Sequence, residues 1–174
     1  MLGRRLGGRR TVSTVSKEKR LVANLERTLI IVKPDGVQRG LVGEILGRLE
    51  GRGLKIVALQ LQTVPRDVAE KHYGEHAGKP FFAGLIDYII SGPVVSAVLE
   101  GPNAIDATRA TMGATNPAKA GPGTIRGDHA LIMGRNLIHG SDSAESAARE
   151  IGIFFGGSEI ASYSRSIDPW IIEE

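Results

Sequence analysis

The fold is indicated first by residues 28–36, Thr-Leu-Ile-Ile-Val-Lys-Pro-Asp-Gly. Residues 29–32 are a short run of β-prone apolar side chains, and Pro34-Asp35-Gly36 is a turn sequence that stops the run. A continuous apolar run of this length is typical of a buried strand. We therefore predict a buried strand that ends in a turn, with Lys33 at the junction.

Strands and helices are predicted to alternate after this first strand. Apolar residues at helical spacing indicate helices, and β-rich runs bounded by Gly or Pro indicate strands. The order is β-α-β-α-α-β-α-β-α, which is typical of an α+β sandwich of the split βαβ kind. The expected strands are 29–32, 54–62, 94–99 and 129–133, and the expected helices are 41–49, 67–76, 81–91, 102–112 and 142–154.

Local signals refine three of these boundaries. Asp67 and Asp142 each precede a Glu by three residues, so both are predicted to cap a helix through a capping box. Residues 113–127 are rich in Gly and Pro and are predicted to form a long loop, which is more often functional than idle. Residues 136–142 are interpreted as a polar turn.

The charge of the chain is concentrated at one end. The 174 residues include 22 Lys and Arg against 19 Asp and Glu, a net charge of +3. Residues 1–27 hold eight basic and two acidic residues, a net charge of +6, which leaves −3 for the rest. We predict that residues 1–26 are a disordered basic extension and that residues 27–174 form one domain. A cytoplasmic location is expected, with an organellar one as the alternative, because transit peptides share this Arg-rich, acid-poor composition.

Composition and motifs also exclude several classes of protein. The absence of Cys excludes a disulfide scaffold, a Cys-ligated metal site and a Cys nucleophile. No apolar run approaches the roughly 20 residues of a membrane-spanning helix. Neither standard glycine-rich nucleotide loop is present. Nucleic acid is not expected as a partner because no aromatic residue accompanies the basic extension, and any such binding should weaken steeply with salt and disappear on deletion of residues 1–26.

Among the four histidines, His139 differs from the others. His72 and His76 lie four residues apart on a predicted helix, where a solvated face is favoured over a metal site because no third ligand is evident. His129 falls in a predicted strand and is interpreted as structural. His139 precedes a predicted helix, whose free N–H groups attract anions. A neutral imidazole at this position could attack an electrophilic phosphorus, although an ordinary exposed turn histidine is the alternative.

Four further polar residues at the ends of predicted elements could bind an anion together. They are Lys33, Arg109, Thr115 and Arg126. The forked donors of Arg suit a phosphate with several oxygens. Each of these residues taken alone is interpreted more simply as a solvated side chain, so the prediction rests on their combination.

The segments that carry these residues resemble the nucleoside diphosphate kinase family. The last matching segment, Asn136 to Ser143, is complete and reads Asn-Leu-Ile-His-Gly-Ser-Asp-Ser. The resemblance extends over about residues 26–172, nearly the whole of the predicted domain. The matching segments are 28–44, 72–73, 79–82, 91–94, 115–118, 122–128 and 136–143.

The resemblance implies a ferredoxin-like α+β fold, with an antiparallel four-stranded sheet covered by helices, and a ping-pong phosphoryl transfer. A nucleoside triphosphate would give its γ-phosphoryl to His139, and the phosphohistidine would pass it to a nucleoside diphosphate. An inactive scaffold member of the family is the alternative. A lost catalytic residue would favour that alternative, and none is lost here.

The resemblance also implies a role for each site residue. Lys33, Tyr73, Arg109, Thr115, Arg126 and Asn136 would contact phosphate or sugar, Phe81 would stack on the base, and Ser141 and Glu150 would support and orient His139. Of the pair Phe81 and Phe82, one is expected to face the cleft and the other the core. Mg²⁺ is the expected cofactor, held by phosphate oxygens and water without direct protein ligation. The protein is expected to form a homo-oligomer, with a hexamer favoured over a tetramer.

Overall fold

The structure is a computed structural model that describes residues 25–158 and 160–172. Its centre is a four-stranded sheet in the order β2-β3-β1-β4, and each neighbouring pair is antiparallel. The strands are β1 (Glu26–Val32), β2 (Lys55–Gln62), β3 (Val94–Gly101) and β4 (Ile138–Gly140). This sheet confirms the predicted ferredoxin-like α+β fold.

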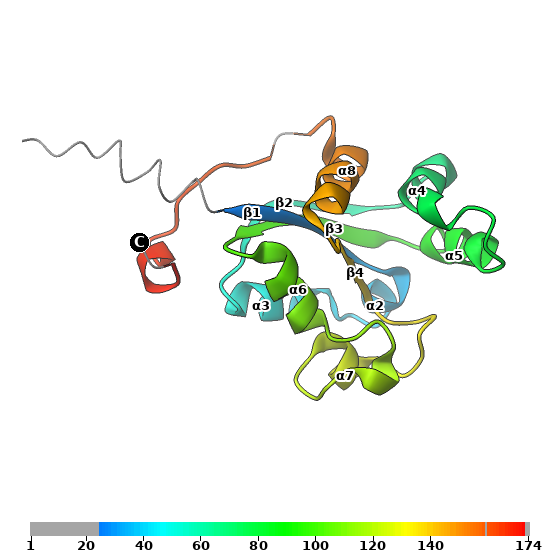
Figure 1. Ribbon diagram of the computed structural model, residues 1–174, viewed down its shortest axis with the longest axis horizontal. Helices are drawn as coiled ribbons and strands as arrows, with labels where there is room; N and C mark the ends of the chain where they lie inside the picture. Colours follow the sequence, from blue (N-terminus) through cyan, green and yellow to red (C-terminus); the bar gives the residue numbers. More distant parts are fainter. Residues whose placement is uncertain (1–24, 159, 173–174) are drawn as a thin grey trace, which may run out of the picture.

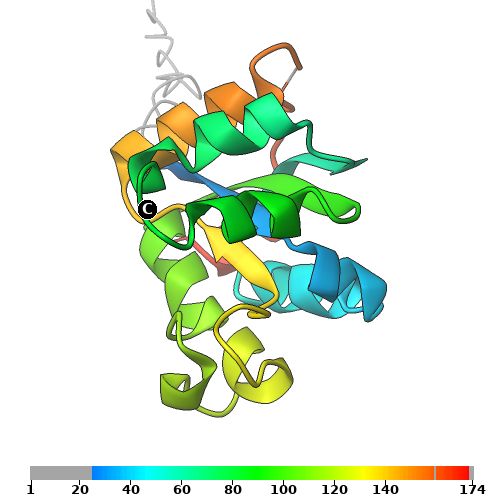
Figure 2. The same ribbon diagram turned by 90° about the vertical axis from the view of Figure 1, so that its right-hand side faces the viewer.

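Helices cover both faces of the sheet (Figures 1 and 2). One face is covered by α4 (Arg66–His72), α5 (Phe82–Ile89) and α8 (Ala144–Phe155), and the other by α3 (Val42–Gly51) and α6 (Ala104–Met112). Shorter elements connect them. These are α2 (Pro34–Gln38), α7 (Ile125–His129) and the 3-10 turns η1 (Gly74–His76), η2 (Pro117–Lys119) and η3 (Asp168–Trp170).

The apolar run in β1 builds two hydrophobic cores. Leu29 and Ile31 pack with residues of α4, α5 and α8, whereas Ile30 and Val32 pack with residues of α3 and α6. All four side chains are fully buried. Successive side chains of a strand point to opposite faces of its sheet, so a strand between two helical layers is apolar at every position. The predicted burial of this strand is confirmed, and the burial extends to both of its faces.

The position of the fourth strand was the main error of the sequence prediction. Residues 129–133 do not form a strand, because His129 ends α7 and Leu131 is 92% exposed. The fourth strand is β4, which lies within the segment predicted to be a polar turn. His139 is therefore paired with Ile31 inside the sheet, not placed in a turn before a helix. A strand of three residues is too short for a two-residue period to be visible in the sequence.

The helix caps also differ from the predictions. The N-cap of α4 is Pro65, so Asp67 lies within the first turn and caps nothing. Ser143, not Asp142, caps α8, and its side chain accepts a backbone N–H of the first turn. The predicted loop over residues 113–127 contains η2 and the start of α7. These shifts of one or two residues leave the order of helices unchanged.

The predicted disorder of residues 1–26 and the predicted domain boundary are not tested by the fold. The basic extension predicted at residues 1–26 lies almost wholly outside the described residues, with β1 beginning at Glu26. Its disorder and the domain boundary therefore stay predictions.

Within residues 25–158 and 160–172, none of the helices has the length and apolar character needed to cross a membrane.

Candidate active site

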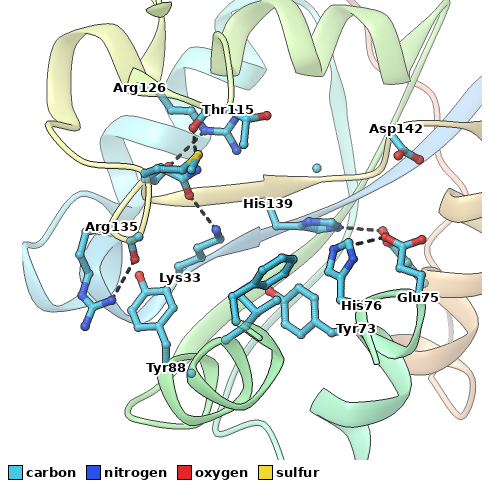
Figure 3. Close-up of a pocket in the computed structure, with 18 of the residues that line it drawn as sticks. Lys33, Tyr73, Glu75, His76, Tyr88, Thr115, Arg126, Arg135, His139 and Asp142 are labelled. Carbon is cyan, nitrogen blue, oxygen red and sulfur yellow. Dashed lines mark hydrogen bonds and ion pairs between the residues drawn. The ribbon is translucent and has the colours of Figure 1, made fainter. Parts of the chain in front are cut away.

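A cleft of about 760 Å³ opens where β1 ends and β4 begins. Figure 3 shows Lys33 and His139 within it, with Thr115 and Arg126 on one side and Tyr73 and Tyr88 on the other. Most of the side chains predicted for the site meet here although they come from distant parts of the chain. Those that line the cleft are Lys33, Tyr73, Phe81, Arg109, Thr115, Arg126, Asn136, His139 and Glu150. Ser141 is buried beside them and bonded to Glu150.

His139 is oriented by a buried carboxylate. Its Nε2 lies 3.0 Å from Oε2 of Glu150, and the hydroxyl of Ser141 donates to the same oxygen at 2.7 Å. Burial alone would raise the pKa of Glu150, but the hydrogen bond and charge of His139 and the hydrogen bond of Ser141 lower that pKa to about 2. Glu150 is consequently an ionised acceptor at neutral pH.

This contact fixes the tautomer of the neutral imidazole. An ionised carboxylate can only accept hydrogen bonds, so the Nε2 of His139 must carry the proton that it shares with Glu150. The lone pair of the neutral ring then lies on Nδ1. Nδ1 is the nitrogen of His139 that is available for bond formation.

His72 contradicts the prediction of a solvated helix face. The residue is only 3% exposed, and its ring packs edge-on against that of His139 with centroids 4.7 Å apart. Burial, reinforced by the charge of His139, lowers the pKa of His72 to about 3. Neither ring nitrogen has a hydrogen-bond partner in the described part of the chain. His72 is therefore a neutral packing partner of His139, while His76 is less buried and lines the cleft.

Lys33 and Asn136 tie two walls of the cleft together. The Nζ of Lys33 donates to Oδ1 of Asn136 at 2.7 Å, and the amide of Asn136 donates to the Thr115 carbonyl at 2.9 Å. Burial, together with the charge of Arg126, lowers the pKa of Lys33 to about 8. An anion in the cleft would favour the charged form of Lys33.

Arg126 is a buried cation that holds the backbone around the cleft. Its guanidinium donates to the carbonyls of Gly113, Asn136 and Ile138 at 3.0, 3.2 and 2.6 Å. Burial and the nearby charge of Arg109 lower the pKa of Arg126 to about 10. No salt bridge joins either arginine to a carboxylate among the described residues, so both guanidinium groups can interact with an anion such as phosphate.

Aromatic side chains form the wall of the cleft contributed by α4 and α5. Phe81 is 55% exposed and lines the cleft, whereas Phe82 is partly buried and packs against the core. The expectation that one of the pair faces the cleft is confirmed. The ring of Tyr73 packs in the core while its edge reaches the cleft. An exposed aromatic face beside a cationic cleft is suited to a ligand that carries both a ring and phosphates.

The family model described as nucleoside diphosphate kinase matches residues 26–160 of the chain. The chain belongs to the nucleoside diphosphate kinase family. A nucleoside diphosphate kinase from Thermomicrobium roseum is 64% identical over 148 residues, which are 85% of this chain and 99% of the relative. One from Archaeoglobus fulgidus is 59% identical over 150 residues, 86% of this chain and 99% of the relative. The family predicted from the sequence is thereby confirmed.

Solved structures of nucleoside diphosphate kinases share the fold. The enzyme from Halobacterium salinarum, determined in complex with CDP, has a TM-score of 0.82 at 48% identity and covers 85% of this chain and 99% of its own. The family protein from Babesia bovis gives the same TM-score and identity over 84% of this chain and 99% of its own. The ferredoxin-like core described above is therefore that of the nucleoside diphosphate kinase family.

Several residues of the cleft in this nucleoside diphosphate kinase family member were missed by the sequence prediction. Gly84, Leu85 and Tyr88 line the cleft together with Phe81, because positions three, four and seven residues apart share one face of α5. That spacing was visible in the sequence and could have identified them. Arg135, whose guanidinium lies 4.1 Å from the Tyr88 ring centroid, gave no such signal.

Three potential metal ligands meet in the described part of the chain. Ligand atoms of His72, His139 and Glu150 all lie within 4.8 Å of one another. Two of these three donors are imidazole nitrogens, whereas Mg²⁺ is bound in proteins by oxygen atoms at close to octahedral geometry. The group is thus a poor match to Mg²⁺. Its arrangement is explained by the contacts through which Glu150 and His72 hold His139 in place. The expectation of Mg²⁺ without direct protein ligation stays a prediction.

Proposed function

We propose that this chain transfers the γ-phosphoryl group of a nucleoside triphosphate to a nucleoside diphosphate in two steps through His139. In the first step the Nδ1 lone pair attacks the γ-phosphorus, a P–N bond forms, and the bond to the β,γ-bridging oxygen breaks as the diphosphate leaves. In the second step a terminal oxygen of the acceptor diphosphate attacks the same phosphorus and the P–N bond breaks. Membership of the nucleoside diphosphate kinase family and the bond between His139 and Glu150 support this proposal.

Glu150 stabilises the product of the first step. When Nδ1 bonds to phosphorus, the imidazole becomes positively charged, and the ionised carboxylate that receives its Nε2–H is placed to stabilise that charge. Ser141 keeps the carboxylate in position by donating to the same oxygen. Glu150 therefore orients the nucleophile, and Ser141 orients Glu150, as in other sites where a second and a third group activate a nucleophile.

The cations and hydroxyl of the cleft bind the phosphates. Phosphoryl transfer spreads charge over three equatorial oxygens, so catalysis depends on positioning and charge stabilisation. Lys33, Arg109 and Arg126 supply the charge, and Thr115 and Asn136 supply neutral hydrogen-bonding groups. The residues come from different elements, which lets them surround a phosphate chain.

Phe81 supports the base of the nucleotide. Every nucleobase has a π-face, so stacking on Phe81 binds the ring while discriminating little between bases. The Tyr73 hydroxyl has no hydrogen-bond partner in the described part of the chain, and burial raises the pKa of Tyr73, so it stays a neutral donor for sugar or phosphate.

Mg²⁺ accompanies the nucleotide in this proposal. Phosphate oxygens and water would hold the ion, and the protein would contribute indirectly by fixing the phosphates through Lys33, Arg109 and Arg126. The bound ion neutralises charge on the phosphate oxygens. The cationic lining of the cleft, in which the carboxylates are Glu75, Asp142 and the already engaged Glu150, supports this arrangement.

We also propose a cytoplasmic homo-oligomer, with a hexamer favoured over a tetramer. Large apolar side chains are exposed on the edge strand β2, at Leu59 (54%) and Leu61 (67%), and in the segment after α7. Such surfaces are typical of subunit contacts. Mass measurement of the full chain in solution tests the assembly.

The activity is tested by incubating the full-length protein with a γ-labelled nucleoside triphosphate. We expect acid-labile labelling of the wild type, which a nucleoside diphosphate then removes. His139→Ala should abolish both labelling and exchange. His76→Ala is the matched control, since His76 lines the same cleft, and it should keep the label. Unchanged labelling of His139→Ala would show that another residue is the nucleophile.

A further inference from the structure

The residue directly before β4 has a strained backbone. Leu137 has φ of +71°, and it and Asn103 are the non-glycine residues with positive φ in the described part of the chain. Asn tolerates this region through local hydrogen bonding, whereas Leu does not. The amide of Ile138 donates to the carbonyl of Asn136 at 2.8 Å, so Leu137 is the centre of a three-residue turn of the rare, strained kind.

This turn separates two residues of the proposed active site. Asn136 precedes it and faces Lys33, and His139 follows it by two residues in β4. The direction in which each side chain points depends on the backbone angles of Leu137. A strained conformation persists only where its surroundings hold it, and such sites cluster where function needs a fixed geometry.

The segment at the end of β1 holds both polar backbone groups of Leu137. The Lys33 amide donates to the Leu137 carbonyl at 2.8 Å, and the Leu137 amide donates to Oδ2 of Asp35 at 3.2 Å. Gly36 allows the close approach, because a Cβ at that position would lie 3.1 Å from the Leu137 carbonyl oxygen and 2.7 Å from Val32. Of these two hydrogen bonds to the backbone of Leu137, the one from its amide is made to a side chain, that of Asp35, and so can be removed by substitution.

Asp35 is itself fixed by further contacts. Its Oδ1 accepts the Tyr88 hydroxyl at 2.6 Å and the Gly36 amide at 3.0 Å. The guanidinium of Arg135 in turn lies over the Tyr88 ring, whose hydroxyl is the donor to Oδ1 (Figure 3). Neither the cleft lining nor the predicted catalytic set includes Asp35.

We infer that Asp35 is a positioning residue, which holds the strained turn at Leu137 and thereby aligns Asn136 and His139 for phosphoryl transfer. This inference rests on the proposed function for its effect on rate, but the state of the turn can be measured without activity. Without the Oδ2 acceptor, Leu137 relaxes toward negative φ and β4 turns relative to the cleft. A misplacement of about 1 Å is enough to cost up to roughly 100-fold in rate.

The test compares Asp35→Ala and Asp35→Asn with the wild type in the full-length protein. Single-turnover phosphorylation of His139 should fall about 10- to 100-fold in Asp35→Ala. Asp35→Asn keeps one acceptor oxygen for the Leu137 amide and should lose less. Tyr88→Phe removes only the bond to Oδ1, so its loss should also be smaller than that of Asp35→Ala.

A second measurement is independent of catalysis. Hydrogen–deuterium exchange in peptides covering residues 134–141 should quicken in Asp35→Ala, with β2 and β3 unchanged. Arg165→Ala removes bonds to Asp168 and to the carbonyls of Gly53 and Leu54, so it controls for general loss of stability and should leave the phosphorylation rate unchanged.

The possible outcomes separate the inference from the proposed function. Wild-type phosphorylation rate and wild-type exchange in Asp35→Ala would overturn the inference, as would a loss in Tyr88→Phe equal to that in Asp35→Ala. If Asp35→Ala does not fold, a slower rate of Asp35→Asn at unchanged Tm supports the inference, and an unchanged rate overturns it. A wild type that never becomes labelled would refute the proposed function, while the exchange comparison would still decide the role of Asp35.

Discussion

The carboxylate of Glu150, carried by α8, accepts the Nε2–H of His139 at 3.0 Å. The two residues are eleven positions apart, one in β4 and one in α8, and the bond fixes the rotation of the imidazole as well as its tautomer. Ser141 and His72 fill the space around this bond, so the nucleophile has few alternative orientations.

Removal of the charge on Glu150 should slow catalysis. We expect Glu150→Gln to lower kcat/KM about 10- to 100-fold, because the charge that develops on His139 is no longer stabilised by a full negative charge. Phosphohistidine formation by rapid quench is the measurement. Ser143→Ala, which removes only the helix cap of α8, is the control for helix stability, and a rate loss there equal to that of Glu150→Gln would assign the effect to the helix.

Lys33 should make nucleotide binding dependent on pH. Its pKa of about 8 in the free protein lies below the ordinary value of 10.5, so part of the population is neutral at pH 8.5. Binding of phosphate favours the charged form, and we expect net proton uptake at this pH. Calorimetry in two buffers of different ionisation enthalpy measures the uptake. Lys33→Arg, which stays charged, should show none from this position, and equal uptake in that variant would assign the proton to another group.

The low pKa of Lys33 also affects stability. Between pH 8 and pH 10.5 the unfolded chain binds more protons at this position than the folded chain does. The contribution of Lys33 therefore makes the free energy of unfolding increase as pH rises through this range. Lys33→Met should remove that rise. Denaturant titrations at pH 8 and pH 10 compare the two proteins.

His72→Phe should leave the protein at least as stable as the wild type at neutral pH. The substitution removes two buried nitrogens that have no partner, each of which costs roughly 1–3 kcal/mol, while keeping an aromatic ring. Since the pKa of His72 falls from 6.5 to about 3 on folding, the wild type should lose stability as pH falls from 6.5 toward 3. The variant should lose less over that range. A parallel pH dependence of both proteins, measured by urea unfolding, would contradict this account.

Phe81→Ala should weaken the binding of all nucleotides to a similar degree. Loss of one stacking contact costs roughly 1–3 kcal/mol per base, which corresponds to about 5- to 150-fold in Kd. Phe82→Ala is the matched control, because Phe82 packs against the core and should lower Tm with little effect on binding. A change confined to purine or to pyrimidine nucleotides in Phe81→Ala would show that the ring selects a base.

The sequence contained enough information to predict most of the fold because the central strand is apolar at every position. Leu29 to Val32 indicated a buried strand, and the longer helices and the strands β2 and β3 followed from their periodicity. The fourth strand was misplaced for a physical reason. Leu131 and Ile132 are apolar but exposed, whereas the true strand has only three residues and follows a left-handed turn.

The sequence predicted which residues belong to the site but not how they contact one another. The residue types at the cleft could be named from motifs, yet the burial of His72 depends on which face of α4 meets α8, and the sequence of a seven-residue helix does not decide this. The same limit hid Asp35, whose role depends on a backbone angle at Leu137. Neither feature has a signature in residue spacing.

The late position of β4 in the chain has a consequence for its synthesis. Lys33 and Asn136 are 103 residues apart, and β4 pairs with no strand except β1 in the described sheet. A growing chain that has reached β3 therefore carries the aromatic wall and Lys33 but no nucleophile, and its β1 still has an unpaired edge open to other chains. Only after residues 138–155 have been made can that edge close and the histidine acquire its carboxylate. Appearance of a phosphohistidine thus reports that β4 and α8 have been made and have joined the sheet.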